Sequence, residues 1–206
     1  MKTNIMNDYT DYVKNFLIHF PNEGNELPWE IVSNIQNVIQ QKIKLLTADY
    51  RVSQGVAIHK KAQIEENVTL KGPIIINEGC FVGAHAYMRG GVFLGENSVV
   101  GPGCEIKSSF ILSGSSLAHF NFVGDSLIGS YVNMEAGSVI ANHYNERLDK
   151  TIFIMINKKK TAINVTKFGA LVGDHTKIGA NAVLSPGTIL APQSIVSRLE
   201  LVDQSR

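Results

Sequence analysis

Two cationic side chains and one histidine are regularly spaced in the middle of the chain. Arg89 and Lys107 are 18 residues apart, and His119 follows twelve residues after the lysine. Arginine and lysine bind phosphate and other anions, whereas histidine has a pKa suited to accepting a proton near neutral pH. Like charges on neighbouring strands repel each other. If the fold stacks the two cations, we therefore expect either an anion between them or two splayed, solvated side chains.

A six-residue repeat indicates the element that positions these side chains. An aliphatic residue or methionine recurs at every sixth position in the series Val52, Ile58, Ile64, Leu70, Ile76, Val82, Met88, Leu94, Val100, Ile106 and Leu112. Neither a helix, with a period of 3.6, nor a strand, with a period of 2, produces this pattern. A short strand and a corner explain each step, and three steps close an 18-residue triangular coil with the aliphatic side chains inside. Arg89 and Lys107 each follow such a residue, so we expect them to stack on one outer face.

The repeat has two irregular stretches. It falters at Ala118 and shortens to five-residue steps at Val123 and Ile128. We expect this defect to make room for a cleft beside His119. The period is lost again over residues 141–171, and an interruption of this length in a regular coil predicts an extruded loop.

The first 50 residues have a different composition, because Gly24 is the only one of the 18 glycines that lies there. Apolar residues three and four apart predict helices over residues 7–20 and 29–46, which form a helical hairpin. We interpret it as a packing or oligomerisation segment. The predicted parts are a helical segment over residues 1–50, a mainly β region over 51–196 and a C-terminal tail over 197–206.

Composition excludes several classes of protein. Hydrophobic residues make up 44% and the net charge is +1, which predicts a buried core and no general attraction to nucleic acid or an anionic membrane. No apolar run approaches the ~20 residues that a membrane-spanning helix needs. Cys80 and Cys104 form neither a CxxC pair nor a disulfide framework, so we expect a reducing, cytoplasmic environment. We interpret both cysteines as small corner residues of the coil.

The repeat is typical of the left-handed parallel β-helix of hexapeptide-repeat acyltransferases. Within that superfamily the chain resembles the acetyltransferase domain of the bifunctional enzyme that makes UDP-N-acetylglucosamine, and archaeal sugar-1-phosphate relatives. Besides Arg89, Lys107 and His119, the resemblance rests on Gly124-Asp125, on the stretch from Ile128 to Gly137, and on Asn142-His143.

The resemblance implies a role for each matching residue. Arg89 and Lys107 hold a sugar phosphate, and His119 is the general base. The implied substrate contacts are Phe122, Asn133, Asn142 and His143.

Three positions depart from the family pattern. Phe122 replaces a tyrosine that contacts the sugar, and His143 replaces a tyrosine, with Tyr144 one place later. The loop is longer than in the family, so a sugar-phosphate lysine there has three possible counterparts: Arg147, Lys150 or one of Lys158–Lys160.

The implied reaction is attack of an amino group on the thioester of acetyl-CoA, with a backbone N–H polarising the carbonyl. The resemblance implies a homotrimer with sites between subunits, a loop that reaches a neighbour, and coenzyme A near Ala180. It also implies that the uridyltransferase half is absent, since residues 1–50 cannot hold it. The short segment after Leu190 argues against catalysis.

Two other functions use the same scaffold. A non-catalytic trimeric interaction module would dock partners through its helices and basic loop. A zinc γ-carbonic anhydrase needs three converging histidines, two of them spaced His-x4-His, whereas His85, His119 and His143 are 34 and 24 residues apart.

Overall fold

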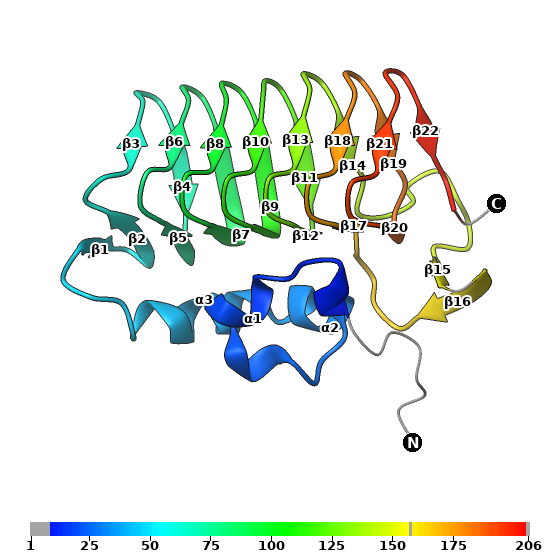
Figure 1. Cartoon of the computed structure of the whole chain (residues 1–206), viewed down its shortest axis with the longest axis horizontal. Helices are drawn as coiled ribbons and strands as arrows, with labels where there is room; N and C mark the ends of the chain where they lie inside the picture. The colour runs from blue at the N-terminus through cyan, green and yellow to red at the C-terminus, as the bar shows by residue number, and fades with distance from the viewer. Residues whose placement is uncertain (1–8, 157, 205–206) are drawn as a thin grey trace.

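A computed structural model describes residues 9–156 and 158–204. Its main body is a β-helix in which short parallel strands wind around three faces (Figure 1). Face 1 consists of β4 (Thr69–Lys71), the first parts of β7 (Tyr87–Leu94) and β9 (Glu105–Ile111), β11 (Phe122–Gly124), β14 (Val139–Ile140), β19 (Val183–Leu184) and β22 (Leu201–Val202). Face 2 consists of β2 (Val56–His59), β5 (Ile74–Ile76), the second parts of β7 and β9, β12 (Leu127–Ile128), β17 (Ala170–Val172) and β20 (Thr188–Leu190). Face 3 consists of β3 (Gln63–Ile64), β6 (Phe81–Val82), β8 (Val99–Val100), β10 (Ser116–Leu117), β13 (Asn133–Met134), β18 (Lys177–Ile178) and β21 (Ile195–Val196).

Parallel strands one coil apart pair with each other, and alternate side chains of a strand enter a continuous interior, as Ile74 and Ile76 of β5 do. Val82, Met88 and Leu94 are fully buried there, as the six-residue series predicts. Cys80 and Cys104 lie in the same interior. The predicted mainly β fold, a β-helix of hexapeptide repeats, is confirmed.

The five-residue steps occur at one corner only. They run from Ile106 to Ile111 and from Val123 to Ile128, both between face 1 and face 2. The shorter corner is closed by a single residue with positive φ, Ser108 or Asp125. The first of these steps shifts the register between β7 and β9.

This placement corrects two predictions about the repeat. Leu112 is buried outside the coil, in the cluster that the helices form, because Ile111 takes the inward position. His119 lies in an ordinary six-residue corner between Leu117 and Val123, so the predicted coil defect beside it is wrong.

The N-terminal segment forms a helical layer over face 2, with shorter helices than predicted. Its elements are η1 (Tyr9–Asp11), α1 (Phe16–His19), η2 (Pro21–Glu23), α2 (Pro28–Ser33) and α3 (Ile35–Ile43). The helix predicted over 7–20 has only one four-residue α-helix, and its first two residues lie outside the described residues. The helix predicted over 29–46 divides at Asn34, which has non-helical dihedral angles and caps α2. No helix in the described residues is long and apolar enough to span a membrane.

The helical layer packs on the outward side chains of face 2. These side chains recur once per coil: Ala57, Ile75, Phe93, Phe110, Leu127, Leu171 and Ile189. Phe16 meets Phe110 edge to face at 5.3 Å between ring centroids, and Phe20 meets Phe93 at 4.9 Å. Face 2 is therefore covered by the same chain.

The predicted loop contains an antiparallel hairpin of β15 (Ile152–Ile156) and β16 (Lys159–Ile163). Ile152, Ile154 and Ile163 are buried in the cluster that the helices share with face 2. The apolar side of the hairpin thus packs on its own chain, and β17 resumes the coil at Ala170.

The two ends of the coil differ from the predicted boundaries. At the start, β1 (Tyr50–Ser53) pairs antiparallel with β2, and Val52 is 51% exposed instead of entering the interior. At the other end, β22 continues face 1 within the segment predicted as a tail, because Leu201 and Val202 pair with β19.

Candidate active site

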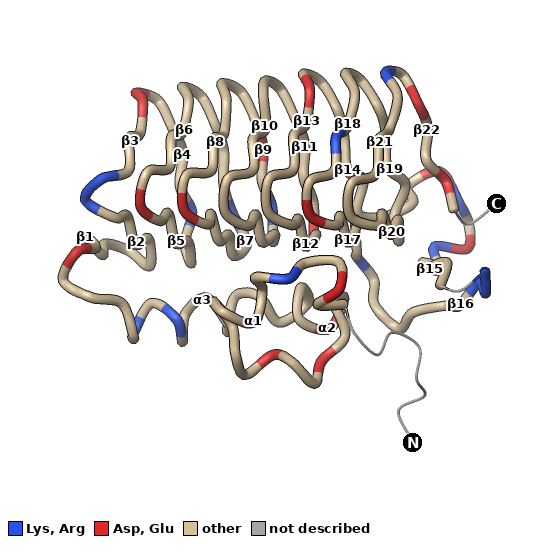
Figure 2. The backbone as a smooth tube through the Cα atoms, viewed as in Figure 1, with Lys and Arg blue, Asp and Glu red and all other residues tan. Residues whose placement is uncertain are grey.

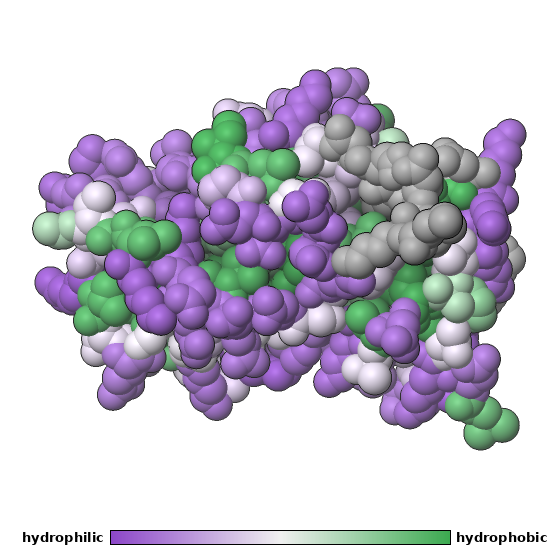
Figure 3. Space-filling model, turned by 90° about the horizontal axis from the view of Figure 1, so that it is seen from below, coloured by the Kyte–Doolittle hydropathy of each residue, from purple (hydrophilic) through white to green (hydrophobic). Residues whose placement is uncertain are grey.

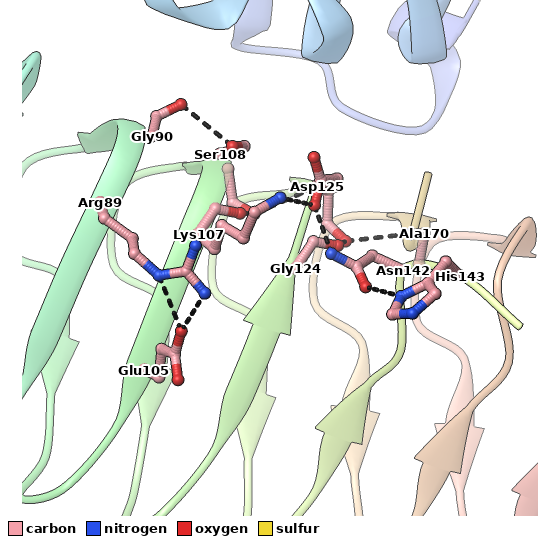
Figure 4. A network of polar contacts seen from close by, with 12 residues as sticks. Arg89, Gly90, Glu105, Lys107, Ser108, Gly124, Asp125, Asn142, His143 and Ala170 are labelled. Atoms are coloured by element: carbon pink, nitrogen blue, oxygen red, sulfur yellow. Dashed lines mark hydrogen bonds and ion pairs between the residues drawn. The ribbon is translucent and has the colours of Figure 1, made fainter. Parts of the chain in front are cut away.

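The outer surface of face 1 brings the two predicted cations together. Arg89 on β7 and Lys107 on β9 are register partners on adjacent coils, and Lys107 is in turn opposite Gly124 on β11 (Figure 4). This is the stacked arrangement that the 18-residue spacing predicts.

Carboxylates compensate both cations, and neither carboxylate was predicted as a partner from the sequence. The Arg89 Nε and Nη2 atoms donate to Glu105 Oε1 at 3.1 and 2.8 Å, and Lys107 Nζ lies 2.5 Å from Asp125 Oδ2. The first pair is partly exposed, at 39% and 35%, whereas the second is mostly buried, at 15% and 12%. Neither a bare cation pair nor two splayed side chains describes this surface. Opposite charges 16 and 18 residues apart were the available signal.

Asp125 joins the cations to the start of the loop. Asn142 Nδ2 donates to Asp125 Oδ2, and Asn142 Oδ1 lies 3.0 Å from Nδ1 of His143. The returning end of the loop fixes this arrangement, since the Phe168 N–H donates to the Asn142 carbonyl at 3.0 Å. Gly124 is required here, because a Cβ atom would lie 2.8 Å from Asn142 Nδ2.

His119 lies at the opposite edge of face 1, at the corner with face 3. Its side chain is exposed. Phe122 follows on β11, half-buried and opposite Glu105 of β9. His119 and Phe122 thus border the same outer surface as the cations, but on the next coil and toward the corner with face 3, since Lys107 is opposite Gly124 at the other end of β11.

Ala180 lies at the same corner as His119, two coils further on. The Gly137 N–H donates to the His119 carbonyl at 2.8 Å, and the Asn181 N–H donates to the Ala136 carbonyl at 3.0 Å, which aligns successive corners. The Ala180 N–H already has a partner, Glu135 Oε2 at 2.9 Å.

Asn133 is the one predicted site residue that one chain does not bring to face 1. It is exposed on face 3, beside a groove whose lining includes Glu135, Lys177 and Arg198. Arg198 donates to both Glu135 oxygens, at 2.7 and 2.9 Å. Hydrogen bonds from Arg198 and from the Ala180 amide lower the pKa of Glu135 to about 2.

The basic residues of the loop are placed differently from one another. The Arg147 guanidinium stacks 3.5 Å from the Tyr144 ring centroid and donates to Asp203 at 2.9 Å, so it is turned toward the C-terminal segment. The Lys160 ammonium lies 4.5 Å from the Phe153 ring centroid. Lys150 is exposed at the surface.

Neither the three histidines considered for a carbonic anhydrase nor the two cysteines form a comparable site. His85 is exposed at the corner between faces 3 and 1, and His143 lies beyond β14, so the carbonic anhydrase set does not converge within one chain. The described part of the chain holds no group of three or more metal-ligating side chains. Burial raises the pKa of the Cys80 thiol to about 11 and also raises that of Cys104, which leaves both thiols unreactive.

Comparison with known proteins gives this geometry a family. The family model of the GMPPB C-terminal domain matches residues 70–198, more than half of the chain. The chain belongs to this family. It is 32% identical to the bifunctional protein GlmU of Methanococcus vannielii over 215 residues, covering 96% of this chain and 50% of that protein. It is 31% identical to the GlmU of Methanocaldococcus jannaschii, covering 96% and 51%.

A third relative is named for two activities. The bifunctional sugar-1-phosphate nucleotidylyltransferase/acetyltransferase of Sulfurisphaera tokodaii is 31% identical over 160 residues, covering 66% of this chain and 39% of that protein. The chain thus spans about half or less of the length of these relatives. They confirm the resemblance to a GlmU-like acetyltransferase domain.

Proposed function

We propose that this chain is an acetyl-CoA-dependent N-acetyltransferase that acts on a phosphorylated amino sugar of the glucosamine-1-phosphate type. The observation that carries the proposal is the outer surface of face 1, where Arg89 and Lys107 stack between His119 on one edge and Asn142-His143 on the other. The family match and the name of the Sulfurisphaera tokodaii relative support it.

Arg89 and Lys107 hold the phosphate in this proposal. Arg89 is the more available, because its pair with Glu105 is more exposed to solvent than the Lys107–Asp125 pair, and ion pairs near the surface are worth only ~0–1 kcal/mol. The phosphate takes the place of Glu105 on the guanidinium, which presents paired donors suited to its oxygens. Lys107 keeps Asp125 and adds positive charge beside the phosphate.

The acyl transfer needs a base and an activated thioester. His119 takes a proton from the ammonium of the sugar, and the free amine attacks the thioester carbonyl. The new N–C bond forms and the C–S bond breaks, and the second proton lost by the amine nitrogen passes to the departing thiolate, so that coenzyme A leaves as its thiol. Phe122, Asn133, Asn142 and His143 contact the sugar, and Ala180 contacts coenzyme A once its amide is released by Glu135.

Asn133 joins the site only if a second copy supplies it, because it lies on face 3. We therefore propose a homotrimer in which face 3 of one subunit approaches face 1 of the next. Light scattering at micromolar concentration should give three times the chain mass of 22.6 kDa. A monomer would exclude the shared site.

The experiment that tests the function is thiol release from acetyl-CoA with a panel of amino sugars, each offered with and without a phosphate. We expect turnover with phosphorylated amino sugars, and a loss of ~1.5–3 kcal/mol in their binding for Arg89→Ala, the scale of a hydrogen bond to a charged group. Equal losses for phosphorylated and unphosphorylated sugars would contradict the phosphate assignment.

One observation favours the alternative of a non-catalytic interaction module. Both Arg89 and Lys107 already have carboxylate partners, so the charges of these two side chains are compensated without a substrate. The same assay separates the two functions, because a non-catalytic module releases no thiol with any acceptor.

A further inference from the structure

A chain of polar contacts runs from face 1 to an exposed histidine (Figure 4). Lys107 Nζ contacts Asp125 Oδ2, the same oxygen accepts from Asn142 Nδ2, and Asn142 Oδ1 contacts His143 Nδ1 at 3.0 Å. The series of contacts thus begins at Lys107, passes through Asp125 and Asn142, and ends at His143.

The direction of these hydrogen bonds is fixed by the ion pair. A carboxylate paired with an ammonium only accepts, so Asn142 must present its NH2 group to Asp125. The carbonyl of the same amide then faces His143 and can only accept. His143 Nδ1 must therefore carry the proton, and in the neutral ring Nε2 is left with a lone pair.

The surroundings hold this orientation in place. Asn142 is 6% exposed, and its backbone carbonyl accepts from the Phe168 N–H. Gly124 lies so close to the amide that a Cβ atom would collide with it. His143 is exposed, and among the described residues Nε2 has neither a hydrogen bond nor an ion pair.

We infer that His143 determines acceptor specificity, with Nε2 receiving a hydrogen bond from an N–H or O–H group of the amino sugar. Asp125 and Asn142 are positioning residues that select the tautomer. The substrate half of this inference rests on the proposed function, whereas the tautomer follows from the structure alone. A tyrosine hydroxyl at this position could donate or accept a hydrogen bond, whereas Nε2 of this tautomer only accepts. The histidine therefore selects amino sugars that present an N–H or O–H group to it.

Imidazole ¹⁵N NMR on the full chain tests the tautomer without any assay of activity. Long-range proton–nitrogen correlations at neutral pH should show His143 protonated on Nδ1 and unprotonated on Nε2, the reverse of the preference of free histidine. Asn142→Leu, and separately Asp125→Asn, should return His143 toward the ordinary mixture. His119 serves as a control in the same spectra, because its signals should not change.

Two outcomes of these spectra would show that Asp125 and Asn142 do not select the tautomer of His143. One is a wild-type His143 protonated on Nε2. The other is a tautomer that remains unchanged in both variants. The second variant guards against misfolding of the first, since asparagine keeps the shape of Asp125 while allowing the amide of Asn142 to reverse.

Titration with glucosamine 1-phosphate tests the substrate contact. The Nε2 resonance of His143 should shift as the sugar is added, and His143→Phe should weaken binding roughly tenfold, the scale of one lost hydrogen bond. His143→Gln, which keeps an acceptor, should recover part of the loss. A saturable sugar titration that leaves Nε2 unperturbed, or no binding of any amino sugar in the panel, would overturn this contact. Absence of thiol release despite a shifted Nε2 would instead count against the proposed function.

Discussion

Faces 1 and 2 are built from the same repeat but meet different surroundings. The outward positions of face 2 are apolar, and Phe93 and Phe110 are at most 1% exposed beneath the helical layer. The outward positions of face 1 include Arg89 and Glu105, which form a partly exposed ion pair across adjacent coils, and Lys107, which forms a mostly buried ion pair with Asp125. The outer side of the helical layer is again mostly hydrophilic (Figure 3).

The difference shows that the interior and the outer surface of the coil are specified separately. Inward side chains are aliphatic behind both faces, for example Met88 and Leu94 on the single strand β7. The outward side chains then decide whether a face becomes a second core or a charged surface. Figure 2 shows that positive and negative residues are interspersed along the coil, whereas the end of the β15–β16 hairpin is basic, so the charge on face 1 acts locally.

The largest effect should come from His119, on the edge of face 1. General-base catalysis contributes 10²–10⁴-fold, so His119→Ala should lower kcat by about that factor in the thiol-release assay. His119→Asn should be nearly as slow. Urea unfolding should give wild-type stability for both variants, because the side chain is exposed. Near-wild-type turnover on every acceptor would make this histidine structural.

The next effect should come from face 2 and should appear as lost stability. Phe110→Ala removes a fully buried ring that contacts Phe16 and Phe20, so the free energy of unfolding should fall by ~3–5 kcal/mol. Phe122→Ala is the matched control on face 1, where the half-buried ring should cost less. Similar losses in urea unfolding would erase the contrast between the faces.

The two ion pairs should differ in the same measurement. Lys107→Ala leaves Asp125 mostly buried without its cation, so we expect a loss of ~1–3 kcal/mol. Arg89→Ala disrupts an exposed pair and should cost ~0–1 kcal/mol. Adding Asp125→Ala to Lys107→Ala should recover part of the stability. A larger loss for Arg89→Ala than for Lys107→Ala would reverse this ranking.

The smallest effect should be a pH dependence of stability that comes from His19 of α1 in the helical layer. Burial lowers the pKa of His19, and Lys42 adds to the shift, while Glu96 opposes it. The folded state therefore holds its proton less tightly than the unfolded state, whose histidine has a pKa of 6.5. Stability is complete above that pH and falls as the pH decreases through it toward the folded pKa. His19→Gln should flatten this slope in urea unfolding, and an unchanged slope would assign it to other groups.

The sequence predicted the coil because its signal is long and has a period that helices and single strands lack. It could not place the short corners, since Ile111 and Leu112 are both aliphatic and only packing decides which one turns inward. The outward apolar column was visible as triplets such as Ile74–Ile76, but its partner could not be named before the helices were placed.

The two cations of the candidate site were predicted from the sequence, but their carboxylate partners were not. Arg89 and Lys107 follow directly from the 18-residue coil. The pairing of Lys107 with Asp125 depends on a five-residue corner that brings Asp125 just past Gly124, and a uniform repeat does not contain it. The Asn142–His143 contact lies at the start of the irregular loop, where no period applies.

The corner between face 1 and face 2 has a consequence for how such a protein can diversify. From Ile58 to Val202, the other two corners keep a constant step of six residues, while this one is shortened at Ser108 and Asp125 and expanded into the hairpin loop after Ile140. Chain length can therefore vary here without disturbing the interior, because the coils above and below stay in register. Segments transplanted into this corner would be displayed beside Lys107 and His143, so the scaffold offers an engineer one place where new recognition can be grafted onto an existing reaction surface.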